Sequence, residues 1–243
     1  MPEFDRYLES YSKEIDDVIG IFGKKQEFFV KHKAEILLRA FATVDENISN
    51  LKVLDVGCGT GMVHPHISES VGELYGADVS DPSIELARKH NPTVHYNTYD
   101  GQILPYADAS FDCAFAICVL HHVPVDQWAF FIKDVSRVVK PGGLALFIEH
   151  NPINPATQWV VNTCKFDANA HLVTSWTLRR LLKSAGVEHP WVKYILFTPF
   201  ASNAFRLLDQ LLSAVPFGAQ YVMGGKVAVL PKATSHSLAA SRR

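Results

Sequence analysis

The sequence predicts an α/β fold built on a mostly parallel sheet, and three observations support this prediction. Residues 51–56 form a short run rich in Leu and Val, which is typical of a buried parallel strand. Gly57, Gly59 and Gly61 follow at alternate positions, before sequence compatible with a helix resumes. Further apolar runs at 73–79, 113–119 and 144–149 alternate with stretches of helical periodicity.

Composition favours one large domain and gives no sign of a nucleic-acid partner. A chain of 243 residues with 48% hydrophobic side chains can bury a single core. Its 23 basic and 25 acidic side chains give a net charge of −2, so nothing predicts nucleic-acid binding. Four cysteines without C-x-x-C spacing favour a reduced, cytoplasmic protein: Cys58, Cys113, Cys118 and Cys164.

No segment predicts secretion or membrane insertion. The first residues are acidic and lack the apolar core of a signal peptide. The longest candidate span, residues 195–217, contains Arg206 and Asp209, so we expect no stable membrane insertion. Residues 231–243 are expected to form a disordered tail.

The glycine turn is the first candidate binding element. Glycine lacks a Cβ, so backbone can pass close to a ligand, and a helix starting beyond the turn would offer unpaired N–H groups. The spacing is G-x-G-x-G, preceded by Asp55, and differs from the G-x-G-x-x-G pattern of dinucleotide-binding proteins. The stretch 53–61 resembles the first motif of class I S-adenosylmethionine-dependent methyltransferases, most closely the type 11 group, and further segments resemble this family in the right order.

This resemblance implies a Rossmann-like three-layer sandwich with a seven-stranded, mostly parallel sheet, an antiparallel last strand and an N-terminal helical cap. The cap is expected at 1–46, the methyltransferase domain at 47–230 and the tail at 231–243. The phrase 137–143, ending in Pro141-Gly142-Gly143, is similar to the family and is expected to end a helix and return the chain to the sheet. Expected strands are 51–56, 73–79, 93–98, 113–119, 144–149, 191–197 and 220–229, and expected helices are 81–90, 126–140, 174–185 and 200–215. The apolar stripe of 200–215 fits a core or dimer face, or a lid over the acceptor.

Two acids follow later strands and are candidate cofactor ligands. Asp78, about 20 residues beyond the glycines, is placed to accept hydrogen bonds from both ribose hydroxyls, and its charge disfavours a 2′-phosphate. The role of helix N-cap belongs more naturally to Asp81. Asp100 matches the position from which the family's acid accepts a hydrogen bond from the adenine amino group, although Gly101-Gln102 departs from the family's pattern. The expected cofactor is S-adenosylmethionine, with S-adenosylhomocysteine as product, bound by Tyr11, Asp55, Gly57, Cys58, Gly59, Gly61, Asp78, Val79, Asp100, Gly101, Ala116 and Ile117.

The acceptor site is expected at the end of the 113–119 strand, where His121 and His122 follow. Ligands of open parallel sheets bind outside the carboxyl ends of strands. Imidazole titrates near neutrality, so His121 is the candidate catalytic base or acceptor-positioning group. Adjacent side chains point in different directions, so at most one of the two histidines should face the cleft. Further candidate acceptor contacts are Tyr7, His122, His150, Asn151 and His171, although Tyr7 and Tyr11 could equally be packing residues.

A zinc site is a rival interpretation for the histidines, and we predict no metal. His64-Pro65-His66 has a tight spacing for one metal centre, and the acidic oxygen ligands of metal-using relatives have no match. The histidines that this rival would draw on are His64, His66, His121, His122, His150 and His171.

The predicted activity is methyl transfer to an oxygen, nitrogen or carbon nucleophile of a small molecule by in-line displacement. A quinone-like ring or a lipid-linked saccharide is an alternative acceptor. Two hypotheses from other classes stay open: a nicotinamide-dependent oxidoreductase, disfavoured by the glycine spacing and the absence of a recognisable Tyr-x-x-x-Lys pair, and a non-catalytic adenosylmethionine-binding partner subunit. The chain is expected to be a monomer or a homodimer.

Overall fold

The structure, a computed structural model, describes residues 26–164, 169–197 and 209–229. Within these residues one sheet of seven strands has the order β3-β2-β1-β4-β5-β7-β6. All neighbours pair in parallel except β7, which is antiparallel to both β5 and β6. The sheet therefore confirms the predicted fold class. Its strands are β1 (Lys52–Val56), β2 (Glu73–Asp78), β3 (His95–Thr98), β4 (Phe111–Ile117), β5 (Val139–His150), β6 (Val187–Ile195) and β7 (Gln220–Val227).

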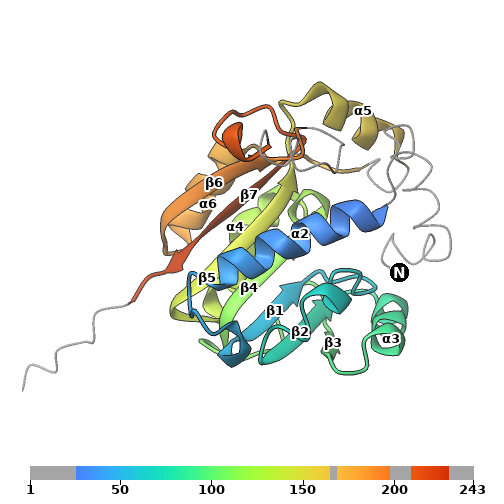
Figure 1. The fold of residues 1–243 in the computed structure, drawn as a ribbon, viewed down its shortest axis with the longest axis vertical. Coiled ribbons are helices and arrows are strands. Elements are labelled where there is room, and N and C mark those ends of the chain that lie inside the picture. Colours follow the sequence, from blue (N-terminus) through green and yellow to red (C-terminus); the bar gives the residue numbers. More distant parts are fainter. Residues whose placement is uncertain (1–25, 165–168, 198–208, 230–243) are drawn as a thin grey trace, which may run out of the picture.

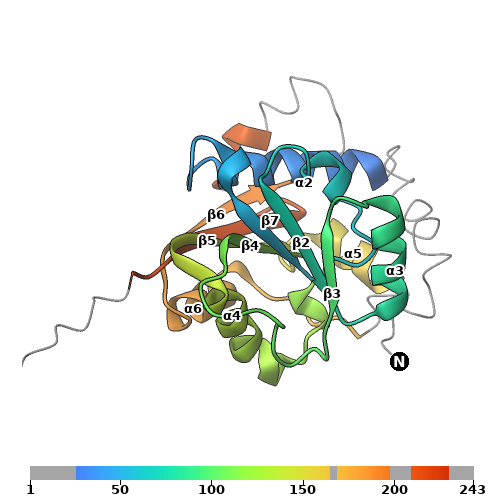
Figure 2. The same ribbon diagram turned by 90° about the horizontal axis from the view of Figure 1, so that it is seen from below.

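Helices cover both faces of this sheet and make three layers (Figures 1 and 2). Helices α2 (Gln26–Phe41) and α3 (Asp81–His90) share one hydrophobic core with the sheet, in which the rings of Phe41 and Phe115 lie 5.8 Å apart. Helices α4 (Trp128–Arg137) and α6 (Ser175–Ser184) share the core on the opposite face. Helix α5 (Pro155–Thr163) follows the carboxyl end of β5. The apolar side chains of α4 recur at intervals of three and four residues, so a single helix face is buried.

Helix α2 is the described part of the predicted N-terminal cap. Its residues Ala34, Leu37, Ala40 and Phe41 are buried in the same core as the strands. The helix is therefore a layer of the sandwich and does not have a core of its own. The remainder of the cap, with Tyr7 and Tyr11, and the predicted tail lie outside the described residues, so the three-part division at 46 and 230 stays a proposal.

The prediction of a helix directly after the glycine turn is wrong. Between β1 and β2 the only helical element is a single 3₁₀ turn, His64–His66. Pro65 has no N–H to donate within a helix. Hydrogen bonds of the His64 ring with Asp55 on β1 and Tyr96 on β3 fix this turn to the sheet.

The boundary between α4 and β5 also differs from the prediction. Helix α4 ends at Arg137, and β5 begins at Val139 rather than at Leu144. Phe111 pairs with Val139, whereas Cys113 pairs with Leu144, so Pro141-Gly142-Gly143 forms an irregularity inside β5. Gly142 adopts a φ of 82°, which lets the strand bend there without ending.

One N-cap residue and one strand boundary were also mispredicted, although α3 spans the predicted residues 81–90. The N-cap of α3 is Ser80, whose hydroxyl accepts a hydrogen bond from Ser83 N, and Asp81 lies inside the helix. Strand β6 begins at Val187 rather than at residue 191, directly after Gly186. Thr174 is the N-cap of α6, and its side chain accepts a hydrogen bond from Thr177 N. The predicted helix at 200–215 lies mostly outside the described residues.

Candidate active site

A cavity of about 740 Å³ opens at the carboxyl ends of the parallel strands. Its walls come from α2, the glycine turn, the ends of β2 and β4, helix α5 and the start of β7, and most of them are apolar. This is the edge where open parallel sheets bind ligands. Twelve predicted site residues line it: Asp55, Gly57, Cys58, Gly59, Asp78, Val79, Asp100, Gly101, Ile117, His121, His122 and His150.

The glycine turn needs glycine for two different reasons. Gly57, Gly59 and Gly61 have φ values of 75°, 51° and 70°, a region that side chains with a Cβ rarely adopt. A Cβ on Gly57 would lie 2.5 Å from Val119 Cγ2, whereas a Cβ on Gly59 would meet no atom within 4 Å. The open space at Gly59 is what close approach of a ligand requires. The turn is fixed to β2 because Gly57 N donates to Ala77 O at 2.7 Å.

Asp78 lies beside this turn at the end of β2. Its Oδ2 accepts a hydrogen bond from Gly59 N at 2.7 Å, and its Oδ1 accepts one from Ser80 N at 2.9 Å. Burial raises the pKa of Asp78 above its ordinary value, and these two N–H donors offset part of that rise. An ionised carboxylate accepts about four hydrogen bonds, so it retains capacity for ribose hydroxyls.

Asp55 is buried beside the glycine turn, and one of its two carboxylate oxygens forms a hydrogen bond. Its Oδ2 lies 3.0 Å from His64 Nε2, while Oδ1 has no hydrogen-bond partner among the described residues. Burial raises the pKa of Asp55, and the hydrogen bond to His64 works against that rise. A buried carboxylate oxygen without a donor costs free energy, which a ligand donor would recover.

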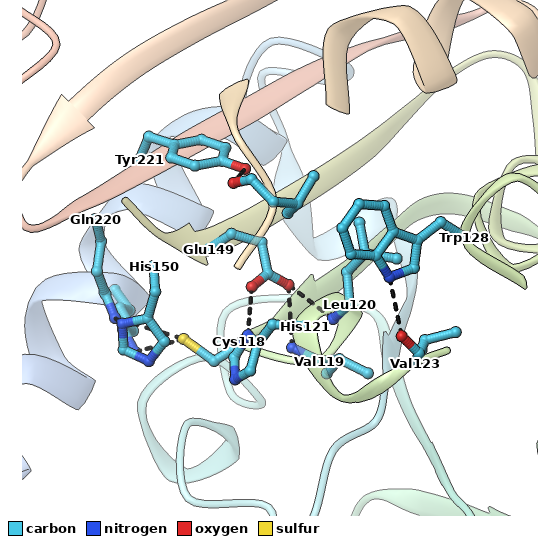
Figure 3. A network of polar contacts seen from close by, with 12 residues as sticks. Cys118, Val119, Leu120, His121, Val123, Trp128, Glu149, His150, Gln220 and Tyr221 are labelled. Atoms are coloured by element: carbon cyan, nitrogen blue, oxygen red, sulfur yellow. Dashed lines mark hydrogen bonds and ion pairs between the residues drawn. The ribbon is translucent and has the colours of Figure 1, made fainter. Parts of the chain in front are cut away.

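His121 is the predicted catalytic residue, and the structure pairs it with Glu149 at the end of β5 (Figure 3). Glu149 Oε2 lies 2.7 Å from His121 Nδ1, and Glu149 Oε1 accepts hydrogen bonds from Val119 N at 3.1 Å and Leu120 N at 2.8 Å. Burial disfavours the charged form of Glu149, but at the acidic pH where carboxyl groups titrate the charge of a protonated His121 and these hydrogen bonds outweigh it, so the pKa of Glu149 falls below its ordinary value. Glu149 therefore orients the imidazole as an ionised carboxylate.

The other histidines surround His121. Its ring centroid lies 4.2 Å from that of His122 and 5.1 Å from that of His150. Both neighbours line the cavity, in contrast to the expectation that at most one of the adjacent pair would do so. The reason is local: residues 120–122 form a 3₁₀ turn, which does not alternate side chains as a strand does.

Sequence reasoning did not find four polar residues of the site. Glu149 was not predicted because it lies in a mostly apolar strand. An acidic residue near the carboxyl end of such a strand is the sequence signal that could have identified it. Gln220 Nε2 lies 3.3 Å from His150 Nδ1 and 3.4 Å from Cys118 Sγ (Figure 3). Lys33 Nζ lies 3.7 Å from Cys118 Sγ. These four residues come from α2, β5, β7 and the end of β4, so only the folded sheet brings them together.

Four predicted contacts do not line the cavity. Asn151 faces the loop before β7, where its amide donates to Pro216 O at 3.0 Å and Gly218 O at 2.8 Å, so it holds that loop. Gly61 packs over Tyr96, whose hydroxyl would lie 2.6 Å from a Cβ at this position. Ala116 is buried within β4. The His171 side chain is exposed, with Nδ1 3.0 Å from Asn169 O, and the His171 backbone N donates to His121 O. The geometry does not support a direct ligand contact for any of these four residues.

Neither a metal cluster nor a membrane-spanning helix occurs in the part of the chain that the structure describes. No group of three His, Cys, Asp or Glu side chains there has the geometry to hold a metal ion. None of the helices in those ranges is both long enough and apolar enough to cross a bilayer.

Comparison with known proteins identifies the family. A family model described as a methyltransferase domain matches residues 54–147. The chain is 31% identical over 174 residues to an O-methyltransferase of Aspergillus nomiae, which covers 63% of this chain and 75% of that relative. The chain belongs to the class I S-adenosylmethionine-dependent methyltransferases. S-adenosylmethionine is accordingly the cofactor of this methyltransferase chain.

Other relatives of this methyltransferase match over shorter stretches. A ubiquinone biosynthesis O-methyltransferase of Sinorhizobium fredii is 33% identical, and the match covers 40% of each chain. A phthiotriol/phenolphthiotriol dimycocerosates methyltransferase of Mycobacterium ulcerans is 30% identical, and the match covers 46% of this chain and 42% of that protein. The methyltransferase thus spans less than half the length of these two curated relatives.

Solved structures show the same fold. A possible histamine N-methyltransferase of Thermotoga maritima superposes with a TM-score of 0.64 at 20% identity, covering 92% of this chain and 97% of that one. The magnesium protoporphyrin IX methyltransferase of Synechocystis, solved with bound S-adenosylhomocysteine, has a TM-score of 0.60 at 15% identity, with the same coverage of 92% and 97%. At these identities the likeness concerns the fold alone.

Proposed function

We propose that this protein transfers the methyl group of S-adenosylmethionine to an oxygen nucleophile of a small, largely apolar molecule. The observation that carries this proposal is the buried His121–Glu149 pair, whose His121 lines a mostly apolar cavity that is also lined by the glycine turn. O-methyltransferases occur among the relatives, which supports oxygen over nitrogen or carbon.

The residues present fit the cofactor. Asp78 would accept hydrogen bonds from the ribose hydroxyls and Asp100 would face the adenine amino group, since both acids line the cavity. The unpartnered Asp55 Oδ1 suits a cationic donor such as the α-ammonium group. When bound, S-adenosylmethionine supplies a methyl group on a sulfonium, which leaves as a neutral thioether. The protein's own contribution is to hold the nucleophile in line with that methyl group, away from water.

His121 supplies the proton acceptor for a hydroxyl nucleophile. With its Nδ1–H donated to Glu149, the neutral ring carries its lone pair on Nε2, and His121 lines the cavity. Nε2 would accept the proton of a hydroxyl nucleophile, and the ionised Glu149 would stabilise the resulting imidazolium. His122 and His150 are proposed acceptor contacts because they lie beside His121 and line the same cavity.

The cavity walls restrict the acceptor. Apolar side chains from several elements form most of the surface around the polar group of His121, His150, Gln220 and Lys33. Such a wall favours a ring or chain of low polarity bearing a hydroxyl, including a quinone-like ring, over a saccharide, whose many hydroxyls would be left without partners. Among the acceptor alternatives we therefore favour the apolar one.

The two alternative functions, an oxidoreductase and a non-catalytic subunit, predict different ligands or activities. A nicotinamide-dependent oxidoreductase would bind NADH, which family membership disfavours. A non-catalytic partner subunit would bind S-adenosylmethionine and methylate nothing, and the His121–Glu149 pair argues against it because a binding subunit has no use for an oriented base.

Calorimetric titration with S-adenosylmethionine, S-adenosylhomocysteine and NADH tests the cofactor, and an acceptor screen with labelled methyl donor tests the activity. We expect binding of the first two ligands alone, and methylation of phenols or other apolar alcohols. Binding of NADH alone would overturn the proposal. Tight binding of S-adenosylmethionine without transfer to any acceptor would favour the partner subunit.

A further inference from the structure

A chain of buried hydrogen bonds lies beneath the glycine turn, and methyl transfer does not use its middle and far members. His64 Nε2 lies 3.0 Å from Asp55 Oδ2, and His64 Nδ1 lies 2.5 Å from the Tyr96 hydroxyl. The exposed fractions are 3% for Asp55, 0% for His64 and 7% for Tyr96. A histidine with both ring nitrogens engaged in the interior has one defined orientation.

The direction of the protons in this chain follows from Tyr96. Burial raises the pKa of the Tyr96 hydroxyl far above its ordinary value, and the negative potential of Cys58 and Asp55 adds to this rise, so the group keeps its proton. It therefore donates to His64 Nδ1. The other nitrogen, Nε2, carries the N–H and donates to Asp55 Oδ2. Tyr96 thus selects the tautomer that supports an ionised Asp55.

Close packing holds the chain in place. A Cβ on Gly61 would lie 2.6 Å from the Tyr96 hydroxyl and 2.9 Å from His64 Nδ1. The Asn91 amide closes the same space and donates to Gly61 O at 3.3 Å. The turn that receives the cofactor and the chain that ends on Asp55 therefore form one packed unit.

The other end of the chain is the unpartnered oxygen. Asp55 lines the cavity, and its Oδ1 has no donor among the described residues although Oδ2 has one. Other titratable groups that face Asp55 are Asp78 on β2 and Cys58 in the turn, and neither supplies a positive charge. His64 is thus the group that opposes protonation of Asp55, against burial and the nearby Asp78.

We propose that His64, oriented by Tyr96, is a positioning residue that keeps the Asp55 carboxylate ionised and aimed so that Oδ1 receives the α-ammonium group of S-adenosylmethionine. This inference rests on the cofactor site proposed above. Without the His64 N–H, Asp55 retains its proton to higher pH. Binding of the ammonium group must then release that proton to solvent, which weakens binding at acidic pH.

Calorimetric affinity for S-adenosylhomocysteine, measured from about pH 5 to about pH 7.5, tests this, because an α-amino group stays largely protonated over that range. The variants are His64→Leu, His64→Gln and Tyr96→Phe. Glutamine places an amide N–H near the position of Nε2 and does not titrate. His66→Leu, in the same turn, is the matched control, and thermal unfolding checks that each variant is folded. Methylthioadenosine, which lacks the amino-acid portion, is the control ligand.

We expect the wild-type affinity to fall below a characteristic pH, and His64→Leu to raise that pH. The loss of a hydrogen bond to a charged group should weaken binding about tenfold or more at the acidic end, and far less at about pH 7.5. His64→Gln should restore most of the wild-type profile, Tyr96→Phe should shift it in the same direction as His64→Leu but less, and methylthioadenosine should show no shift.

Four outcomes separate the inference from the proposed function. An unchanged pH profile in a folded His64→Leu variant would overturn the inference, and so would an equal loss of affinity at every pH, because a merely structural histidine would cause that. An equal shift with methylthioadenosine would also overturn it. Failure of the wild-type protein to bind S-adenosylhomocysteine at any pH would instead overturn the cofactor site itself.

Discussion

Glu149 Oε2 lies 2.7 Å from His121 Nδ1, with only 1% of either side chain exposed. Glu149 lies near the end of β5, and His121 lies in the turn that follows the neighbouring parallel strand β4. Glu149 also accepts hydrogen bonds from the backbone of Val119 and Leu120. One carboxylate thus fixes both the imidazole and the backbone of the turn that carries it. Under the proposed mechanism, stability and chemistry are coupled at this point, because a change in Glu149 would alter both.

The depressed pKa of Glu149 predicts a pH-dependent contribution to stability. A carboxyl group whose pKa is lower in the folded than in the unfolded chain stabilises the fold above the unfolded value, ordinarily about 4.5, and loses this effect as pH falls through the folded value. Glu149→Gln should therefore lower the free energy of unfolding by about 1.5–3 kcal/mol near neutral pH. Urea unfolding at a series of pH values measures this. The difference from wild type should shrink as the pH falls below the ordinary carboxyl value, and a constant difference would contradict the ionised form.

Gly57→Ala and Gly59→Ala make a matched pair. Both positions have positive φ, so each substitution strains the backbone by roughly 1 kcal/mol. Only at Gly57 does the added Cβ also meet Val119 Cγ2. We expect thermal unfolding to show the larger loss of stability for Gly57→Ala, by about 1–3 kcal/mol beyond that of Gly59→Ala. Gly59→Ala should instead mainly weaken cofactor binding, measured by calorimetry. The reverse order would mean that the turn relaxes around Val119.

Local patterns were sufficient to predict the glycine turn and the position of Asp78, because each follows directly from one strand and the turn after it. The partners of His121 and His64 could not be predicted in this way. Glu149 is 28 residues from His121, and Tyr96 is 32 residues from His64, and only the strand order places them side by side. Asn151 was mispredicted because it follows β5 at the correct edge but holds the loop before β7. Gln220, which pairs with His150 across β5 and β7, faces the cavity instead.

Asp78→Ala should weaken the binding of S-adenosylhomocysteine by about 1.5–3 kcal/mol, the range for hydrogen bonds that involve a charged group. Part of this loss should arise within the protein, because Asp78 also accepts a hydrogen bond from Gly59 N. Asp78→Asn separates the two effects. Its amide oxygen can still accept from Gly59, so the turn should hold while the charge is lost. Calorimetry should place Asp78→Asn between wild type and Asp78→Ala, and wild-type affinity in both variants would remove Asp78 from the site.

Substitution of His121 separates its chemical role from its structural one. In His121→Asn the amide nitrogen takes the place of Nδ1 and can still donate to Glu149, whereas the proton-accepting Nε2 is gone. His121→Ala removes both and leaves Glu149 buried without that donor. Both variants should slow methyl transfer to a hydroxyl acceptor by about 10²–10⁴-fold, the usual contribution of a general base, and both should bind S-adenosylhomocysteine nearly as wild type does. Only His121→Ala should lose about 3–5 kcal/mol of stability, because it breaks a buried pair. Steady-state kinetics, calorimetry and urea unfolding measure the three quantities, and normal turnover in His121→Asn would show that the acceptor loses its proton without His121.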